Sequence, residues 1–233
     1  MVLILGSINK VNISEKDNVN YWNEFYKSFN LIEESSFCGF VKSFINDTEI
    51  KVLDIGCGSG RDTFSFARDG YEVIGIDRSE ESIKFNNNIR ENFPDIKDKI
   101  NFFTVDISDR ESFSSIFKSY RHSKENKNKK ILVYLRFLLH SISEETEKKV
   151  LDILSENMIK GDTIAAEFRT VEDRDMDKHY QNHYRRFICA EDLIENLEVS
   201  YNFKNVYFQK GRGMSIYKGE DPYLARIVVQ KNN

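Results

Sequence analysis

An apolar run that stops at three regularly spaced glycines constrains the fold of this chain most strongly. The run covers residues 50–55, and Gly56, Gly58 and Gly60 follow it at intervals of two. Residues 62–67 then repeat apolar side chains at helical spacing. This order predicts a buried strand, a tight turn and a helix that packs back on the strand. Glycines suit the turn because they adopt positive φ and let a ligand approach the backbone closely.

Two classes of cofactor-binding protein use a turn of this kind. The dinucleotide-binding fingerprint G-x-G-x-x-G/A, if it starts at Gly56, needs a small residue at position 61. That position holds Arg61, whose bulk would prevent the close contact between helix and strand. The turn therefore argues against NAD and FAD. A glycine turn without any cofactor, which other α/β proteins contain, stays open at this point.

Two further predicted strands end in an acidic residue. Residues 71–77 close on Asp77 and residues 100–106 close on Asp106. An acid at the end of the second strand can accept hydrogen bonds from ribose hydroxyls. Either acid alone could be a solvated loop residue. The glycine turn followed by both acids at regular intervals is far more specific, and it predicts one ligand site.

Composition and charge narrow the class of protein. The 233 residues include 40% hydrophobic and 31% charged residues, which is typical of a globular chain rather than a disordered one. The net charge of −4 argues against a nucleic-acid partner. Cys38, Cys57 and Cys189 are scattered without metal-like spacing, so we expect no metal site and a reduced, cytoplasmic protein. No apolar run approaches the ~20 residues of a membrane span.

Strands and helices are predicted to alternate along the rest of the chain. Further strands are expected at residues 130–140, 163–168, 206–209 and 224–229. Helices are expected near residues 33–46, 80–92, 109–120, 144–158 and 190–197. The alternation predicts a single α/β domain over residues 1–233. Its sheet would be doubly wound, mostly parallel and seven-stranded, with an antiparallel hairpin at one edge.

An aromatic cluster lies near the start of the chain, where residues 1–30 are predicted to form an N-terminal arm. Tyr21, Trp22 and Tyr26 could lie in a lid that covers a ligand and excludes water. The alternative is a helix that packs its apolar side on the sheet.

The form D-x-G-x-G-x-G over residues 54–60 resembles the glycine-rich loop of class I S-adenosylmethionine (SAM) methyltransferases. With the later elements in order, the resemblance covers residues from about 20 to the end, and it implies a Rossmann-like methyltransferase fold. It also implies SAM as the cofactor and S-adenosylhomocysteine as the product, with Asp106 facing the adenine. The implied cofactor-site residues are Asp54, Gly56, Gly58, Gly60, Arg61, Asp77, Arg78, Asp106, Ile107, Tyr21 and Trp22.

Motifs in the second half are more particular. Residues 134–140, 167–169, 183–187 and 221–226 are similar to small bacterial methyltransferases encoded with capsule and lipopolysaccharide biosynthesis. Some of those are thought to methylate phosphoramidate or phosphonate decorations. The resemblance implies a small-molecule acceptor, either nucleotide-activated or polysaccharide-linked, and leaves the oligomeric state open. The chain lacks Asn/Asp-Pro-Pro-Tyr after its fourth strand, which disfavours methylation of amino groups on adenine or glutamine.

The sequence leaves two acceptor chemistries open. An anionic oxygen needs cationic groups to position it. A sugar hydroxyl needs a base near neutral pKa, and His140 and His183 are the candidates. The residues expected to bind the acceptor are Arg136, Arg169, Arg185, Arg186, Tyr26 and Tyr184. The structural alternatives are a buried histidine at position 140 and a surface arginine pair at 185–186. Outside the enzymes, a SAM-binding protein without turnover is the alternative.

Overall fold

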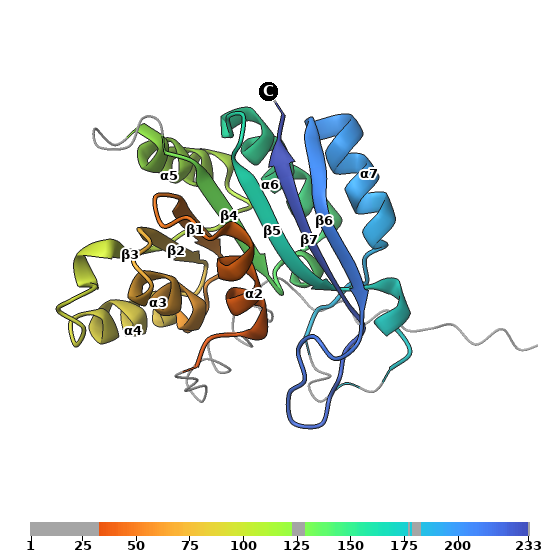
Figure 1. Ribbon diagram of the computed structural model, residues 1–233, viewed down its shortest axis with the longest axis horizontal. Coiled ribbons are helices and arrows are strands. Elements are labelled where there is room, and N and C mark those ends of the chain that lie inside the picture. Colours follow the sequence, from red (N-terminus) through yellow and green to blue (C-terminus); the bar gives the residue numbers. More distant parts are fainter. Residues whose placement is uncertain (1–32, 123–128, 177, 179–182, 233) are drawn as a thin grey trace, which may run out of the picture.

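The computed structural model describes residues 33–122, 129–176, 178 and 183–232 (Figure 1). The predicted N-terminal arm, with Tyr21, Trp22 and Tyr26, lies outside these described residues.

Within the described residues, seven strands form one sheet in the order β3-β2-β1-β4-β5-β7-β6. Strands β1 to β5 pair in parallel, and β7 runs antiparallel to both β5 and β6. This confirms the mostly parallel sheet with an antiparallel hairpin at its edge. The strands are β1 Lys51–Ile55, β2 Val73–Asp77, β3 Ile100–Thr104, β4 Ile131–Arg136, β5 Thr163–Arg169, β6 Phe203–Gly211 and β7 Leu224–Lys231.

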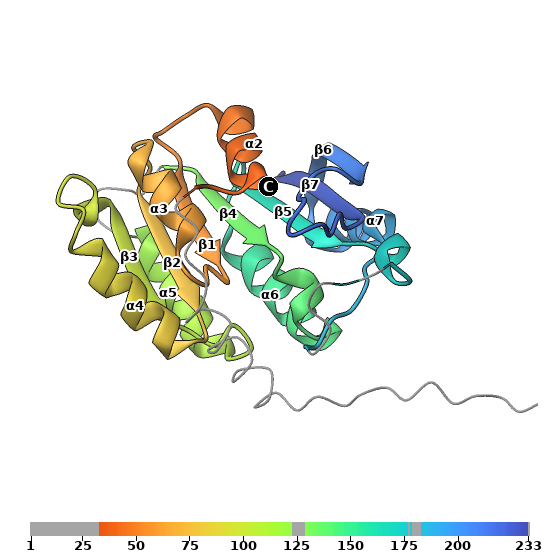
Figure 2. The ribbon, with the colours of Figure 1, turned by 90° about the horizontal axis from the view of Figure 1, so that it is seen from below.

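Helices cover both faces of the sheet (Figure 2). The helices are α2 Ser36–Ile45, α3 Arg61–Arg68, α4 Glu80–Arg90, α5 Arg110–His122, α6 Glu144–Asn157 and α7 Ala190–Tyr201. Apolar side chains of α2, α3 and α4 pack in one core cluster, and those of α5, α6 and α7 pack in the other. Because both faces are covered, the central strands β1, β4 and β5 are buried and mostly apolar, as parallel strands usually are.

Serines begin three of these helices. The side chains of Ser35, Ser79 and Ser143 accept hydrogen bonds from the first turns of α2, α4 and α6 respectively. A serine in this position satisfies a backbone N–H that the helix leaves without a partner. The caps therefore fix where these helices start.

The fourth strand ends earlier than predicted. Strand β4 stops at Arg136, whereas the apolar run suggested a strand over residues 130–140. Phe137 adopts a left-handed conformation with φ of 56°, which ends the extended backbone. The chain then forms the short 3₁₀ helix η2, Leu139–Ser141, before α6. The neighbouring parallel strands β1 and β4 are continued on opposite sides, because the chain passes from β1 to β2 and from β4 to β5. Folds of this kind bind ligands at the point where the strand order reverses in this way.

Candidate active site

The glycine turn between β1 and α3 has the backbone that only glycine adopts without strain. Gly56, Gly58 and Gly60 have φ angles of 77°, 52° and 72°. A Cβ atom on Gly56 would lie 3.0 Å from Leu138 Cδ1, and one on Gly60 would lie 3.1 Å from Asn86 and Phe102. Side chains here are therefore opposed by both conformation and space.

Asp77 faces the turn from the end of β2. Its Oδ2 accepts a hydrogen bond of 2.9 Å from the Gly58 N–H, and its Oδ1 accepts one of 2.9 Å from the Ser79 N–H. A carboxylate can accept about four hydrogen bonds, so its two oxygens keep capacity for a ligand. Burial raises the pKa of Asp77, and its half-buried side chain lines the cavity.

Asp54 lies behind the turn at the end of β1. Its Oδ2 accepts a hydrogen bond of 2.6 Å from the Thr63 hydroxyl. Burial raises the pKa of Asp54 to about 7, and the nearby carboxylates of Asp62 and Asp77 contribute to this rise. The group therefore titrates close to neutral pH in the free protein.

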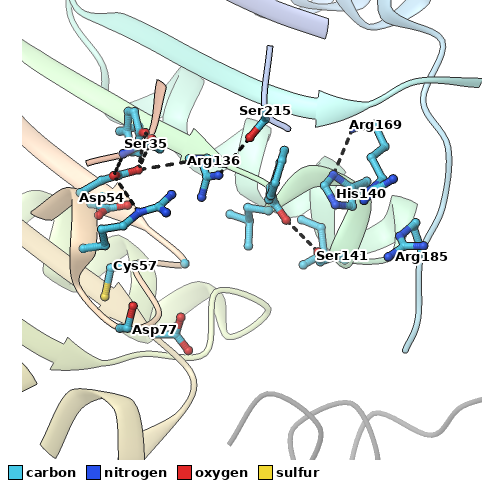
Figure 3. Close-up of a pocket in the computed structure, with 18 of the residues that line it drawn as sticks. Ser35, Asp54, Cys57, Asp77, Arg136, His140, Ser141, Arg169, Arg185 and Ser215 are labelled. Atoms are coloured by element: carbon cyan, nitrogen blue, oxygen red, sulfur yellow. Dashed lines mark hydrogen bonds and ion pairs between the residues drawn. The ribbon is translucent and has the colours of Figure 1, made fainter. Parts of the chain in front are cut away.

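A cavity of about 820 Å³ extends from this turn across the carboxyl ends of the strands. Figure 3 shows Asp77 and Cys57 on one side of it, Arg136 in the middle, and His140 and Arg185 on the other side. We call the part around Gly56, Asp77 and Asp106 the glycine end. The predicted site residues that line the cavity are Asp54, Gly56, Arg61, Asp77, Arg78, Asp106, Ile107, Arg136, His140, Arg169, His183, Tyr184 and Arg185.

The acid after β3 is placed differently from Asp77. Asp106 is exposed, and its Oδ1 accepts hydrogen bonds of 2.9 and 2.7 Å from the N–H and hydroxyl of Ser108. Asp106, Ile107 and Ser108 all line the glycine end. The turn after β3 thus supplies both an apolar side chain and a carboxylate to this end of the cavity.

Sequence reasoning missed Asp62, which connects the glycine turn to the middle of the cavity. Its carboxylate accepts hydrogen bonds of 2.8 Å from the Ser35 N–H and 2.7 Å from the Tyr134 hydroxyl. Arg61 Nε lies 3.3 Å from one of its oxygens, and Arg136 Nε lies 3.9 Å from the other. The sequence signal that could have identified it is an acid directly after the glycine turn, at the expected start of a helix. In the structure this side chain lies in the first turn of α3 and is buried.

Arg136 and Phe137 stand where the two parts of the cavity meet. The Arg136 guanidinium lies 4.4 Å from the centroid of the Phe137 ring, which is a cation–π contact. Arg136 Nε is also 3.4 Å from the buried carboxylate of Glu167. Phe137 is an aromatic residue in the left-handed region, a conformation that costs about 1–2 kcal/mol and is found preferentially at functional sites.

His140, Arg169, His183 and Arg185 form what we call the arginine end of the cavity. His140 Nδ1 accepts a hydrogen bond of 3.2 Å from the backbone N–H of Arg169, so the proton of its neutral ring is on Nε2. His183 Nε2 lies 2.9 Å from Arg185 Nη2, and it accepts this hydrogen bond because a guanidinium can only donate. Each histidine therefore uses the lone pair of one ring nitrogen within the protein.

Burial lowers the pKa of both histidines, and the surrounding arginines lower it further. For His140 the pKa lies well below its usual range, and for His183 it falls to about 4. At neutral pH both rings are uncharged. With the lone pairs engaged as described, the geometry favours His140 as a hydrogen-bond donor to a ligand over its predicted role as a base.

Of the four arginines predicted to bind the acceptor, Arg136, Arg169 and Arg185 line the cavity and Arg186 does not. Arg186 is not among the residues lining the cavity, because it donates to the carbonyls of Leu139 and Ile142 and pairs with Glu147 of α6. Arg169 lines the cavity but is held by Asp173 and Glu220. The position of Arg186 therefore gives no support to its predicted role in acceptor binding. Its contacts instead connect η2 to α6.

The connection between β6 and β7 forms one wall, and sequence reasoning missed it. Met214, Ser215, Tyr217 and Glu220 from this connection line the cavity. Ser215 Oγ lies 3.4 Å from Arg136 Nη2, and Glu220 pairs with Arg169, so the connection is fixed at both ends of this wall. Residues 183–185 and the helix η2 close the remainder.

No group of three or more His, Cys, Asp and Glu side chains in the described part of the chain could hold a metal ion. No helix in the same part is both long and apolar enough to cross a membrane.

Comparisons with known proteins agree with this architecture. A family model described as a methyltransferase domain matches residues 46–160. No curated protein sequence matches the chain. A SAM-dependent methyltransferase from Anabaena variabilis has a similar structure, with a TM-score of 0.70, 20% identity, and coverage of 98% of this chain and 99% of that chain.

Two other solved structures show what else this fold can hold. The 1,6-didemethyltoxoflavin-N1-methyltransferase of Burkholderia thailandensis, solved with S-adenosylhomocysteine, has a TM-score of 0.62 and 15% identity over 94% of this chain and 85% of that chain. The [4+2]-cyclase SpnF has a TM-score of 0.63 and 14% identity over 87% of this chain and 84% of that chain. At these identities the likenesses establish the fold and leave the reaction to be argued from the site.

Proposed function

We propose that the chain is a class I SAM-dependent methyltransferase that transfers a methyl group to an oxygen of a small anionic acceptor; the methyltransferase-domain match over residues 46–160 and the shared fold support this. The cofactor would occupy the glycine end of the cavity and the acceptor the arginine end. SAM supplies a methyl group on a positively charged sulfur, which is readily attacked by a nucleophile. The protein must therefore bind both molecules in line and keep water away.

The glycine end fits the cofactor on four observations. The turn brings its backbone to the cavity in a conformation that side chains would oppose. Asp77 retains acceptor capacity for ribose hydroxyls after its two backbone contacts. Asp54 and Arg61 lie at the other side of the turn, where they would face the amino and carboxylate groups of the methionine part. Asp106 and Ile107 would border the adenine.

One observation carries the anionic acceptor: the lone pairs that His140 and His183 could have used as bases are already engaged within the protein. A neutral hydroxyl must lose a proton as it is methylated, and it would need such a base. An oxygen that is already ionised needs none. Its negative charge would instead be held by the positive field of the arginines at this end of the cavity.

A phosphoramidate or phosphonate group is the acceptor favoured by the motifs of the second half. The relatives named above give no support to the predicted link with capsule or lipopolysaccharide biosynthesis, so that link rests on those motifs alone. Cytoplasmic small-molecule chemistry on a nucleotide-activated or polysaccharide-linked intermediate remains our proposal for the setting.

The experiment is an acceptor screen with SAM and mass detection of an added methyl group. Phosphonates, phosphoramidates and carboxylates should gain a methyl group, and neutral sugars should not. Methylation of neutral sugars alone would overturn the anionic acceptor and favour a histidine base. Cofactor binding without methylation of any compound would favour a role other than methyl transfer. The [4+2]-cyclase SpnF is an example of a protein with this fold that is named for another reaction.

A further inference from the structure

The arginine end of the cavity has a positive electrostatic balance among the described residues. Arg169 and Arg185 line it together with one carboxylate, that of Glu220, and Lys178 and Asp173 pair with each other behind the lining. Asp173 is fully buried and pairs with both Arg169 and Lys178, so it is used within the wall. The wall therefore has more positive than negative charge to offer a ligand.

The two histidines lie close to these charges. Arg169, Arg185 and Arg186 all lower the pKa of His140, and none of its main influences is a carboxylate. For His183, the lowering by Arg185 and Arg169 exceeds the opposing influence of Glu220. Two neutral groups on different segments thus lie in a positive potential, which an anion in the same space would relieve.

Arg185 makes an orienting contact to a neutral group in this wall. The His183 ring accepts from its Nη2 at 2.9 Å, which fixes one edge of the guanidinium. Arg169, in contrast, donates to carboxylates through both Nη1 and Nη2. His140 is buried with its protonated Nε2 on the side of the ring opposite to the Arg169 backbone contact. An arginine edge and a neutral N–H donor together match the geometry of an oxyanion.

We propose that Arg185, oriented by His183 and assisted by His140, binds an oxyanion group of the acceptor at the arginine end. This inference rests on the proposed function and adds to it the group that is recognised and the residue that recognises it. In this arrangement Arg185 and His140 contact the acceptor, His183 is a positioning residue, and Arg169 and Arg186 support the wall. The shared chemistry is a phosphoryl or carboxylate oxygen.

The test measures oxyanion binding by calorimetry at low salt, with the full chain saturated with S-adenosylhomocysteine. Methylphosphonate and acetate serve as probes, because they separate phosphoryl from carboxylate recognition. At least one of them should bind the unchanged protein, and Arg185→Gln should weaken that binding by ~10-fold or more. Arg110→Gln is the matched control, since Arg110 is exposed, pairs with Glu156 and does not line the cavity.

The histidine variants test the positioning role. His183→Ala should weaken probe binding, and His183→Gln should restore part of it because the Gln carbonyl can accept from Arg185. Equal binding by Arg185→Gln and the unchanged protein, or no binding of either probe to the unchanged protein, would overturn the inference. Affinity for S-adenosylhomocysteine is measured in parallel. If S-adenosylhomocysteine does not bind, the proposed function is wrong. Binding of methylphosphonate or acetate to the free protein then shows whether the oxyanion site exists without the cofactor.

Discussion

At the scale of single residues, Phe137 combines an unfavourable backbone with a central place in the cavity. Its φ of 56° brings its ring against Arg136 and beside His140, with a ring separation of 5.4 Å to the latter. The β5 strand holds this conformation, because the Phe137 N–H donates to the Glu167 carbonyl at 2.8 Å. Stored backbone strain is thus balanced by contacts that position groups at the junction of the two ends.

The strain in Phe137 can be measured by comparing two truncations. Phe137→Ala and Phe137→Gly remove the same ring contacts, but only glycine adopts positive φ without strain. The glycine variant should therefore be more stable than the alanine variant by ~1 kcal/mol in denaturant unfolding. For an ordinary backbone position the order would be reversed, and that result would show that the residue is not strained.

Asp54 gives a second prediction at the residue scale. Its folded pKa of about 7 lies above the unfolded value of 3.8, so the folded state binds the extra proton between these values. Stability contributed in this way is present at low pH and lost as the pH rises toward 7. Asp54→Asn keeps an acceptor for Thr63 and should stabilise the free protein by ~2 kcal/mol or more at about pH 8. The gain should vanish near about pH 4, and a gain independent of pH would contradict the assignment.

At the scale of elements, the helix η2 and the helix α6 are joined by Arg186. Its guanidinium contacts two backbone carbonyls of the η2 segment and the buried carboxylate of Glu147, whose pKa burial raises. The backbone N–H of Arg186 also donates to the His140 carbonyl at 2.9 Å. This tie holds the segment that carries His140 in place, beside the strand that carries Arg169.

Arg186→Met should consequently destabilise the fold without acting on ligands directly. Removing the cation leaves Glu147 and two carbonyls without their donor, which costs ~2–4 kcal/mol. Thermal unfolding should show a lower midpoint, and affinity for S-adenosylhomocysteine should stay unchanged under folded conditions. Glu147→Gln is the matched control, since it removes the charge and retains an acceptor. Normal stability of Arg186→Met combined with lost acceptor binding would restore the substrate-binding role that the sequence suggested.

At the scale of the whole molecule, sequence patterns were enough to predict the sheet, and with it the glycine turn and Asp77 that lie at one end of the cavity. The strand, the glycine turn and Asp77 follow one another within a short stretch, and each has a local signature. The arginine end is built differently, from η2, β5, residues 183–185 and the β6–β7 connection. Which arginine points into a cavity and which pairs with a carboxylate depends on these tertiary contacts. Arg185 and Arg186 are adjacent in sequence, and nothing in their spacing distinguishes them.

The acid stability of the molecule should report the burial of its histidines. His140 and His183 have folded pKa values below the unfolded value of 6.5, so the unfolded chain binds protons that the folded chain does not. Their contribution to stability is complete above about pH 6.5 and is lost as the pH falls below it. Asp54 works in the opposite direction over part of this range, so a single profile mixes these effects.

Comparison with His140→Asn isolates one histidine, because asparagine can accept from the Arg169 N–H and does not titrate. Below about pH 6.5 the unchanged protein should lose stability relative to this variant, with a slope of up to ~1.4 kcal/mol per pH unit. Urea unfolding at several pH values measures this difference in the free energy of unfolding. The smaller volume of asparagine changes the difference by the same amount at every pH and leaves its pH slope unaffected. The slope should be absent above about pH 7. Parallel stability curves through the acid range would mean that His140 takes up its proton in the folded state, where it could then serve as the base.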